Sequence, residues 1–477
     1  MFKKKINYFT LFIIFSGFVL SCFISNNYIE KYDNIKNING IYVNTYFFQK
    51  EGGVPSYWEE AHKIKTEISE KKFIYTGNKY ETKYLPSRLL FLYYSLINKE
   101  IKSEYKDSNQ IVFNTDNGKI RLAIIQNFLY FLCLIYLFLT LKKYWPNVNS
   151  SVLFFVFFFL SFEPTLNQWN RVLFSETIFF CFQLILLSFS ISYNENSSYI
   201  KVFLLGIILS LMYLQRTVAI YYIIIIILYF FIFYKKKSIV NISIILFIYL
   251  ITHLYLGYGN YKRDGKFYLY PILAKEDLYG YFIPKILKHH NDEKFINNFQ
   301  TRHDKVNNLI KINNLNSENE IEINDRIYLA NRNVIDSLNL IIEYPFASIK
   351  EYIKSSIHYF LLKPNEIHYL FENRISYDGK FYLSKKFKNE IYIKLIYSIF
   401  IYSISIVGLF YLKKKGESKL IFLLISSILY FSLPVFWHKQ SSYLAPILLY
   451  LSFFFGFGAN QLLKKLNFNK YVSKYSK

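Results

Sequence analysis

The sequence predicts an all-α polytopic membrane protein with about ten transmembrane helices and two large extracytoplasmic loops that carry interfacial amphipathic helices. Hydrophobic residues make up 53% and aromatic residues 21% of the 477 residues, above the usual share of a soluble domain. Apolar runs long enough to cross about 30 Å of hydrocarbon recur along the whole chain. Together these observations exclude a soluble globular domain.

The lengths of the apolar runs and the positions of Lys and Arg give the order of the spans. Each short segment assigned to the cytoplasm carries Lys, from MFKKK at the start to the basic tail, so both termini are predicted to be cytoplasmic. These anchors explain the net charge of +24, and a nucleic acid is not expected as a partner. The predicted spans lie near 7–25, 121–141, 150–163, 171–193, 201–216, 218–234, 238–256, 391–412, 419–436 and 443–461.

This topology places two large loops, 26–118 and 257–390, outside the cytoplasm. Within them, 83–97 and 334–362 have apolar residues at helical spacing, which predicts folded helices that lie on the membrane surface. The chain is thereby divided into an N-terminal membrane module with the first loop (1–256), the large loop (257–390), and the C-terminal membrane helices with the basic tail (391–477).

The three cysteines, Cys22, Cys133 and Cys181, all lie in or beside apolar spans. An odd count without paired spacing indicates neither a disulfide framework nor a zinc site. Cys22 also ends a loose lipoprotein cleavage box, Val19–Cys22, within a first span that resembles a signal peptide. The nine further spans favour its retention as an uncleaved membrane helix.

Acidic and basic residues stand at the ends of apolar helices in FEPTLNQWNRVLFSETIFF (162–180) and GIILSLMYLQRT (206–217). Hydrocarbon penalises an ionised side chain by about 2.5–3.5 kcal/mol at a helix centre. Glu163, Glu176 and Arg216 are therefore expected at span ends, facing protein or water, on one side of the membrane. This pattern is typical of a membrane enzyme whose chemistry takes place at one interface.

The order of these features resembles the type C membrane glycosyltransferases, in particular the protein O-mannosyltransferase-like and lipid A aminoarabinose transferase-like branch. The resemblance covers most of the chain, although each segment is weak by itself. The matching segments are PSYWEEAHKI with KYLPSRLLFLYYSLI (55–97), the two segments above, the Glu-Tyr-Pro stretch (343–357) and HKQSSYLAPILLYLSFFFGFG (438–458).

The resemblance implies transfer of a sugar from a polyprenyl-phosphate-linked donor to a lipid, glycan or protein acceptor, at the outer face of a bacterial inner membrane. The acceptor hydroxyl needs a carboxylate that removes its proton, and the leaving phosphate needs a cation. No cofactor is certain, and a divalent metal stays open, because His289-His290 has no spaced partners. A nucleotide-sugar donor is not expected, since the sequence has no phosphate-binding glycine-rich loop.

Glu163 and Glu176, at the acid-Pro and Ser-Glu positions of the resemblance, are candidate catalytic carboxylates, and Glu51 is a third candidate. Relatives carry an acid about four residues before the loop tyrosine, but counting back from Tyr57 reaches Gly53. The nearest acids are Glu51, Glu59 and Glu60, and Glu51 is the favoured substitute because the adjacent glycines let the backbone enter a pocket. Each acid also has a structural alternative: a solvated acidic cluster for Glu51, an interfacial anchor for Glu163, and a helix cap for Glu176.

Four basic residues are candidates for binding the donor phosphate: Arg171, Arg216, His438 and Lys439. Arg216 stands between two apolar runs, where a phosphate would satisfy it; pairing with Glu163 or Glu176 is the alternative. His438 and Lys439 precede a Tyr-x-x-Pro segment in which relatives often carry an arginine. Alternatively, these two side chains only place positive charge at the membrane interface, as long basic side chains often do.

Other classes remain open from the sequence alone. An O-antigen-type polymerase or ligase would share many spans, a large outer loop and catalytic arginines, but not a folded loop directly after the first span. A secondary transporter would show repeated halves and ionisable groups at the midplane, and no repeat is seen. A non-catalytic membrane protein is the third alternative, because of Gly53.

Overall fold

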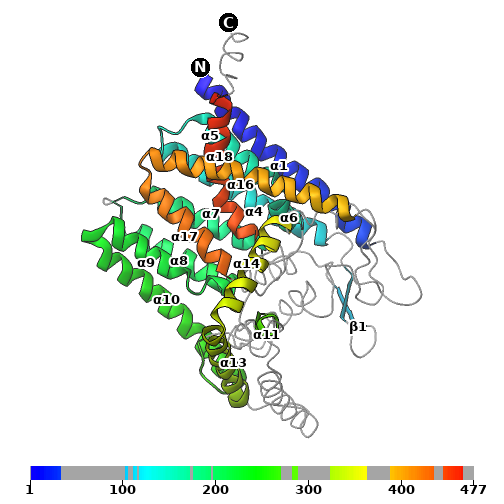
Figure 1. The fold of residues 1–477 in the computed structure, drawn as a ribbon, viewed down its shortest axis with the longest axis vertical. Helices are drawn as coiled ribbons and strands as arrows, with labels where there is room; N and C mark the ends of the chain where they lie inside the picture. The colour runs from blue at the N-terminus through cyan, green and yellow to red at the C-terminus, as the bar shows by residue number, and fades with distance from the viewer. Residues whose placement is uncertain are drawn as a thin grey trace.

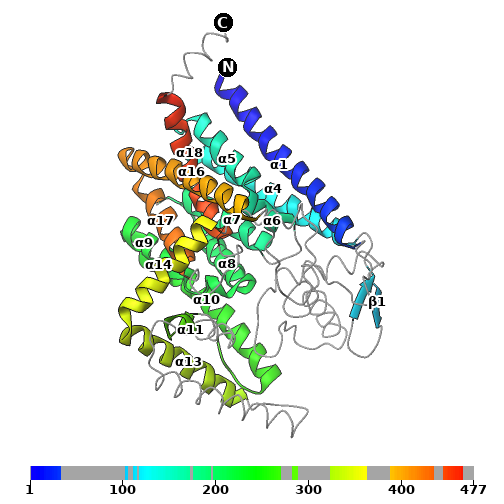
Figure 2. The same ribbon diagram turned by 45° about the vertical axis from the view of Figure 1, so that its right-hand side comes forward.

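The computed structural model describes residues 2–33, 102–105, 111–114, 118–171, 176–194, 197–269, 282–287, 323–362, 387–433 and 444–465. Within these ranges the chain is helical, apart from one two-stranded antiparallel hairpin and short connecting turns. Figures 1 and 2 show the helices as one bundle, with α1 (Phe2–Asp33) along an edge and α18 (Ala445–Lys465) inside it. The described fold is that of a helical membrane protein.

Within the described ranges, five helices are long and apolar enough to cross a membrane. Five shorter apolar helices occupy the other predicted spans, but they fall short of a typical span of about 20 residues, so the count of ten stays a prediction. The long segments are Asn7–Ser25 in α1, Arg121–Tyr144 in α4 (Gly118–Tyr144), Ser238–Lys262 in α10 (Lys235–Asp264), Tyr392–Lys414 in α16 (Phe387–Lys414), and α18. The shorter helices are α5 (Ser150–Phe162), α7 (Glu176–Ser192), α8 (Tyr199–Gln215), α9 (Tyr222–Phe233) with the 3₁₀ turn η1 (Thr217–Ala219) before it, and α17 (Ser418–Ser432).

The boundary before α7 differs from the prediction. The sequence predicted one span over 171–193, whereas the structure forms a separate short helix, α6 (Pro164–Arg171), and begins α7 at Glu176. The polar run in α6 is poorly suited to hydrocarbon, and Pro164 favours the first turn of a new helix. Arg171 therefore closes α6 instead of opening a span.

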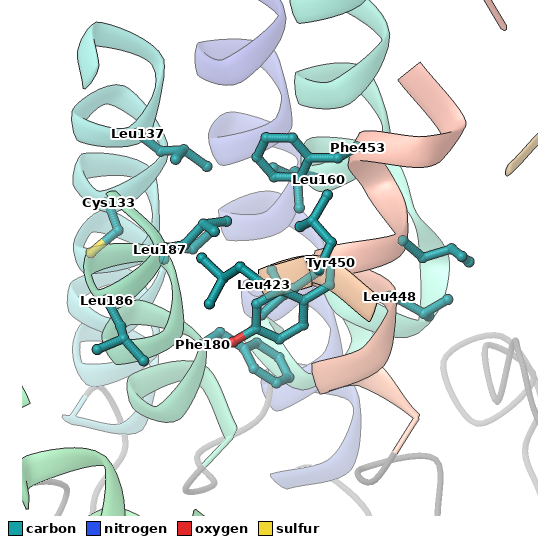
Figure 3. Packing of buried hydrophobic residues seen from close by; sticks show 14 of the residues in the cluster. Cys133, Leu137, Leu160, Phe180, Leu186, Leu187, Leu423, Leu448, Tyr450 and Phe453 are labelled. Atoms are coloured by element: carbon teal, nitrogen blue, oxygen red, sulfur yellow. The ribbon is translucent and has the colours of Figure 1, made fainter. Parts of the chain in front are cut away.

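The core of the bundle is built around α18. Every residue from Ala445 to Asn460 is buried. A helix at the edge of the bundle would instead expose one side to lipid, so α18 lies inside the bundle. Tyr450 of α18 belongs to the same buried cluster as Leu160 of α5 and Leu423 of α17, part of which Figure 3 shows. The helix is apolar on all sides because other helices surround it.

Two glycines let α16 and α18 cross at close range. A Cβ placed on Gly458 would lie 1.9 Å from the carbonyl oxygen of Ile404, and one on Gly408 would lie 1.8 Å from that of Phe454. Both obstacles are backbone atoms, which side-chain rotation cannot remove. The crossing therefore requires glycine on both helices.

Basic and aromatic side chains gather at the end of the bundle where α4 ends and α17 begins. Lys419 lies over the ring of Tyr234 at 4.2 Å, and Lys201 lies over that of Tyr144 at 5.1 Å. Such pairs suit a membrane–water interface. This arrangement agrees with the lysine pattern behind the predicted topology, while the cytoplasmic side and the inner membrane stay predictions.

The predicted amphipathic stretch over 334–362 forms two helices, α13 (Ile323–Glu343) and α14 (Pro345–Leu362). They pack near a short helix, α11 (Ile283–Leu287), through a small apolar cluster around Leu340. The other predicted amphipathic stretch, 83–97, lies outside the described residues.

A hairpin in the first loop departs from the all-α prediction. Strand β1 (Lys102–Tyr105) pairs antiparallel with β2 (Ile111–Asn114), so that Tyr105 lies opposite Ile111. The second strand, IVFN, begins with two β-branched residues and an aromatic one, which favour strands. The pattern is too short to stand out beside long apolar helices.

Candidate functional site

Glu163 lies at the elbow between α5 and α6 and caps the second helix. Its backbone is extended, which ends α5, and Pro164 occupies the first position of α6. The side-chain Oε2 accepts a hydrogen bond from the backbone N–H of Leu166 at 2.7 Å. This is the geometry of a helix N-cap, with the fixed φ of proline preorganising the first turn.

A second bond ties Glu163 to a distant helix. The hydroxyl of Tyr397 on α16 donates to Glu163 Oε1 at 3.0 Å, and the glutamate is only 3% exposed. Burial raises the pKa of the Glu163 carboxyl to about 7, while hydrogen bonds from Leu166, Tyr397 and Thr165 act in the opposite direction. A carboxyl with this pKa exchanges protons near neutral pH, which suits an acid or a base.

Glu176 and Arg216 form a buried ion pair between α7 and α8. Arg216 Nη1 donates to Glu176 Oε1 at 2.9 Å, and both residues are more than nine-tenths buried. The guanidinium also lies 5.8 Å from the ring centre of Phe179. Glu176 is at the N-terminus of α7 and Arg216 at the C-terminus of α8, where the helix dipoles favour these charges.

The turn that follows Arg216 is held by tyrosines from two other helices. The hydroxyl of Tyr430 on α17 donates to the carbonyl oxygen of Val218 and accepts from the N–H of Tyr221. The hydroxyl of Tyr249 on α10 donates to the carbonyl oxygen of Ile220 at 2.7 Å. These bonds hold the backbone just after Arg216 against α10 and α17.

The predicted site residues fall into three groups in the structure. Glu176 and Arg216 are in direct contact, and α6 connects the Glu163 elbow to the same end of the bundle. The side chain of Arg171 lies outside the description, although its backbone ends α6. The residues that fall entirely outside the described ranges are Glu51, His438 and Lys439.

The structure does not test the cavity predicted to be shared by Glu163, Glu176 and Arg216. One crevice among the described residues is lined by α1, α4, α5 and α6, including Ser21, Asn127 and Asn167, and these three ionisable side chains do not line it. Over the same ranges, no three His, Cys, Asp or Glu side chains gather as a metal-binding group. A lipid-accessible cavity at Arg216 and a divalent metal remain predictions.

Sequence reasoning missed the tyrosines that hold this site together. Tyr397, Tyr430 and Tyr249 each bond to the Glu163 elbow or to the turn after Arg216. With 46 tyrosines in the chain, no single one stands out, and these contacts join residues far apart in sequence. Their positions gave no common signal either, since Tyr249 lies in the middle of α10.

No protein-family model matches the sequence, and no curated protein matches it. Among solved structures, the chain is similar to the archaeal oligosaccharyltransferase AglB from Archaeoglobus fulgidus, in complex with an inhibitory peptide and a dolichol-phosphate. The two are 13% identical with a TM-score of 0.45, and the match covers 97% of this chain and 52% of the other. The chain thus spans about half the length of that protein, and a likeness of this degree assigns it neither activity nor substrate.

Proposed function

We propose that the chain is a membrane glycosyltransferase that moves a sugar from a polyprenyl-phosphate donor to a lipid, glycan or protein acceptor at the extracytoplasmic face. The observation that carries the proposal is the buried Arg216–Glu176 pair, at the bundle end where the Glu163 elbow also lies. Burying charges among apolar helices costs several kcal/mol per ion. Such groups are often retained in membranes because they bind a substrate or ion.

Arg216 has the properties that a departing lipid phosphate requires. Its guanidinium is a planar fork of several N–H donors, one of which donates to Glu176 Oε1 at 2.9 Å. The ion pair and the Phe179 ring hold the group in place before a donor arrives. Preorganised positive charge stabilises the negative charge that develops on the leaving phosphate. Arg171, His438 and Lys439 are proposed as further contacts to the phosphate.

Glu163 is the proposed acid–base residue on the acceptor side. A pKa of about 7 gives its carboxyl both protonation states at neutral pH. To accept a proton from a hydroxyl, the carboxylate must exchange its bond from Tyr397 for one from the acceptor. Glu51 is the proposed alternative base, and Glu176 is assigned to orienting Arg216.

Transfer from a labelled donor tests the proposal. The purified protein in nanodiscs is given a radiolabelled undecaprenyl-phosphate sugar with lipid, glycan and peptide acceptors, and Arg216→Lys is compared with the wild type. We expect weaker donor binding and slower transfer, because lysine keeps the charge but loses the planar fork. Arg332→Lys is the matched control, since Arg332 pairs with Asp336 on the exposed face of α13. Equal effects of the two substitutions would refute a phosphate contact at Arg216.

A further inference from the structure

The two carboxylate oxygens of Glu163 accept hydrogen bonds from two different helices. Tyr397 of α16 donates its hydroxyl to Oε1 at 3.0 Å, and Leu166 of α6 donates its backbone N–H to Oε2 at 2.7 Å. Donors in fixed directions on both oxygens set the position and the rotation of a carboxyl group. The side chain of Tyr397 therefore determines half of the geometry of the candidate base.

The part of α16 that carries Tyr397 is itself held by the end of α14. Ser398, which directly follows Tyr397, donates to the carbonyl oxygen of Leu361 at 3.1 Å. Tyr402 donates to the carbonyl oxygen of Phe360, also at 3.1 Å, and its ring packs edge-on against the Phe360 ring. Because these acceptors are backbone atoms of another helix, they fix the backbone of α16 beside Tyr397.

The surroundings of the Glu163 carboxyl favour its neutral form. The residue is 3% exposed, and burial raises the pKa of the carboxyl to about 7. The bond from Tyr397 acts in the opposite direction on this pKa, because it stabilises the ionised carboxylate. Other titratable or charged residues described on the helices around the elbow are Tyr402 and Lys394 of α16, Arg121 of α4 and Glu176 of α7, the last paired with Arg216.

From this geometry we infer that Tyr397 is the positioning residue of Glu163, whose hydroxyl directs the carboxylate and keeps it ionised until an acceptor hydroxyl takes its place. The catalytic meaning of this role rests on the proposed function, whereas the bond between the two side chains does not. The phenol donates a hydrogen bond and keeps its proton, so it is not a second base. Through Ser398 and Tyr402, the end of α14 supports the same geometry.

Thermal unfolding of the full chain in a mild detergent, from pH 4.5 to pH 9.5, tests the inference without measuring activity. The raised pKa of Glu163 stabilises the folded wild type below pH 4.5, and this contribution is lost as the pH rises to about 7. Tyr397→Phe removes the donor to the ionised carboxylate, so the loss should continue to a pH about one to two units higher. In Tyr397→Phe/Glu163→Gln this contribution should be absent, which assigns it to the carboxyl.

Sugar transfer from a radiolabelled undecaprenyl-phosphate sugar gives the second measurement. The pH dependence of kcat/KM reports the ionisation of the free protein, in which Tyr397 holds the carboxylate. In Tyr397→Phe the acid side of this profile should move up by the same one to two pH units, which lowers kcat/KM roughly 5- to 50-fold at pH 7 and lets it recover toward pH 9. A purely structural defect would lower kcat/KM at every pH.

Tyr402→Phe is the matched control, because it removes a hydroxyl of the same helix that bonds to Phe360 instead of Glu163. Neither the stability curve nor the kcat/KM profile should shift along the pH axis in this variant. Equal shifts in Tyr397→Phe and Tyr402→Phe would overturn the inference, as would a stability curve or a kcat/KM profile that Tyr397→Phe leaves in place. A wild type that transfers no sugar would refute the proposed function alone, and the shift in the stability curve would still support the control of Glu163 by Tyr397.

Discussion

Replacing Glu163 by glutamine is expected to remove a pH dependence of stability that the buried carboxyl gives to the wild type. Burial raises its pKa from an ordinary value of 4.5 to about 7, so the folded protein binds this proton more tightly than the unfolded chain. The resulting stabilisation is fully present below pH 4.5 and is lost as the pH rises through 7. At 1.36 kcal/mol per pKa unit, the loss amounts to roughly 3 kcal/mol.

Glutamine keeps the shape of the side chain and an oxygen that accepts the N–H of Leu166, but it has no proton to lose. Thermal unfolding in a mild detergent, measured from pH 4.5 to pH 8, compares Glu163→Gln with the wild type. As the pH rises from 4.5 to 8, the wild type should lose roughly 3 kcal/mol of unfolding free energy that the variant does not lose. Glu343→Gln is the control, because Glu343 is exposed at the end of α13. Parallel stability curves for Glu163→Gln and the wild type would refute the reasoning about the buried carboxyl.

Three further predictions concern the ion pair, the glycine crossing and the topology. Glu176→Gln should lower the free energy of unfolding by about 3–5 kcal/mol, because it leaves Arg216 buried without its carboxylate. The double variant Glu176→Gln/Arg216→Met should recover much of this loss when both are compared by thermal unfolding. Gly458→Ala should lower the free energy of unfolding by about 1–3 kcal/mol, because the new Cβ meets the backbone of α16. Gly206→Ala is the control and should lower it less, because its Cβ meets a movable side chain; equal losses for the two variants would contradict this reasoning. Asn339→Cys should react with an impermeant maleimide in intact cells, and reaction only after the inner leaflet is breached would reverse the topology.

The positions of the membrane helices could be predicted because apolar length and helix ends are local properties. The span predicted over 150–163 is the helix Ser150–Phe162, whose ends are fixed by the Asn149 cap and by Pro164. The pair of helices around Arg216 was likewise visible as two apolar runs with a polar break. The span predicted over 171–193 began too early, because Arg171 belongs to the separate helix α6.

The partners of the site residues were harder to predict because they depend on how distant helices pack. The sequence allowed Arg216 to pair with either glutamate, and only the structure selects Glu176. Tyr397 is 234 positions from Glu163, and no pattern in the chain connects them. The acid-Pro pair indicated an important position, but not that Glu163 is the cap of α6.

The most direct test of the central claim is sugar transfer by the wild type and by Glu163→Gln from a radiolabelled undecaprenyl-phosphate sugar in nanodiscs. If Glu163 removes the proton of the acceptor, transfer by the variant should fall about 10²–10⁴-fold while donor binding is retained, the usual scale for loss of a general base. Glu51→Gln, measured alongside, should show the same loss only if Glu51 supplies the base in place of the acid absent at Gly53. Donor consumption that is unchanged in both variants would contradict a catalytic carboxylate at either position. A wild type that consumes no donor with any acceptor would contradict the glycosyltransferase assignment itself.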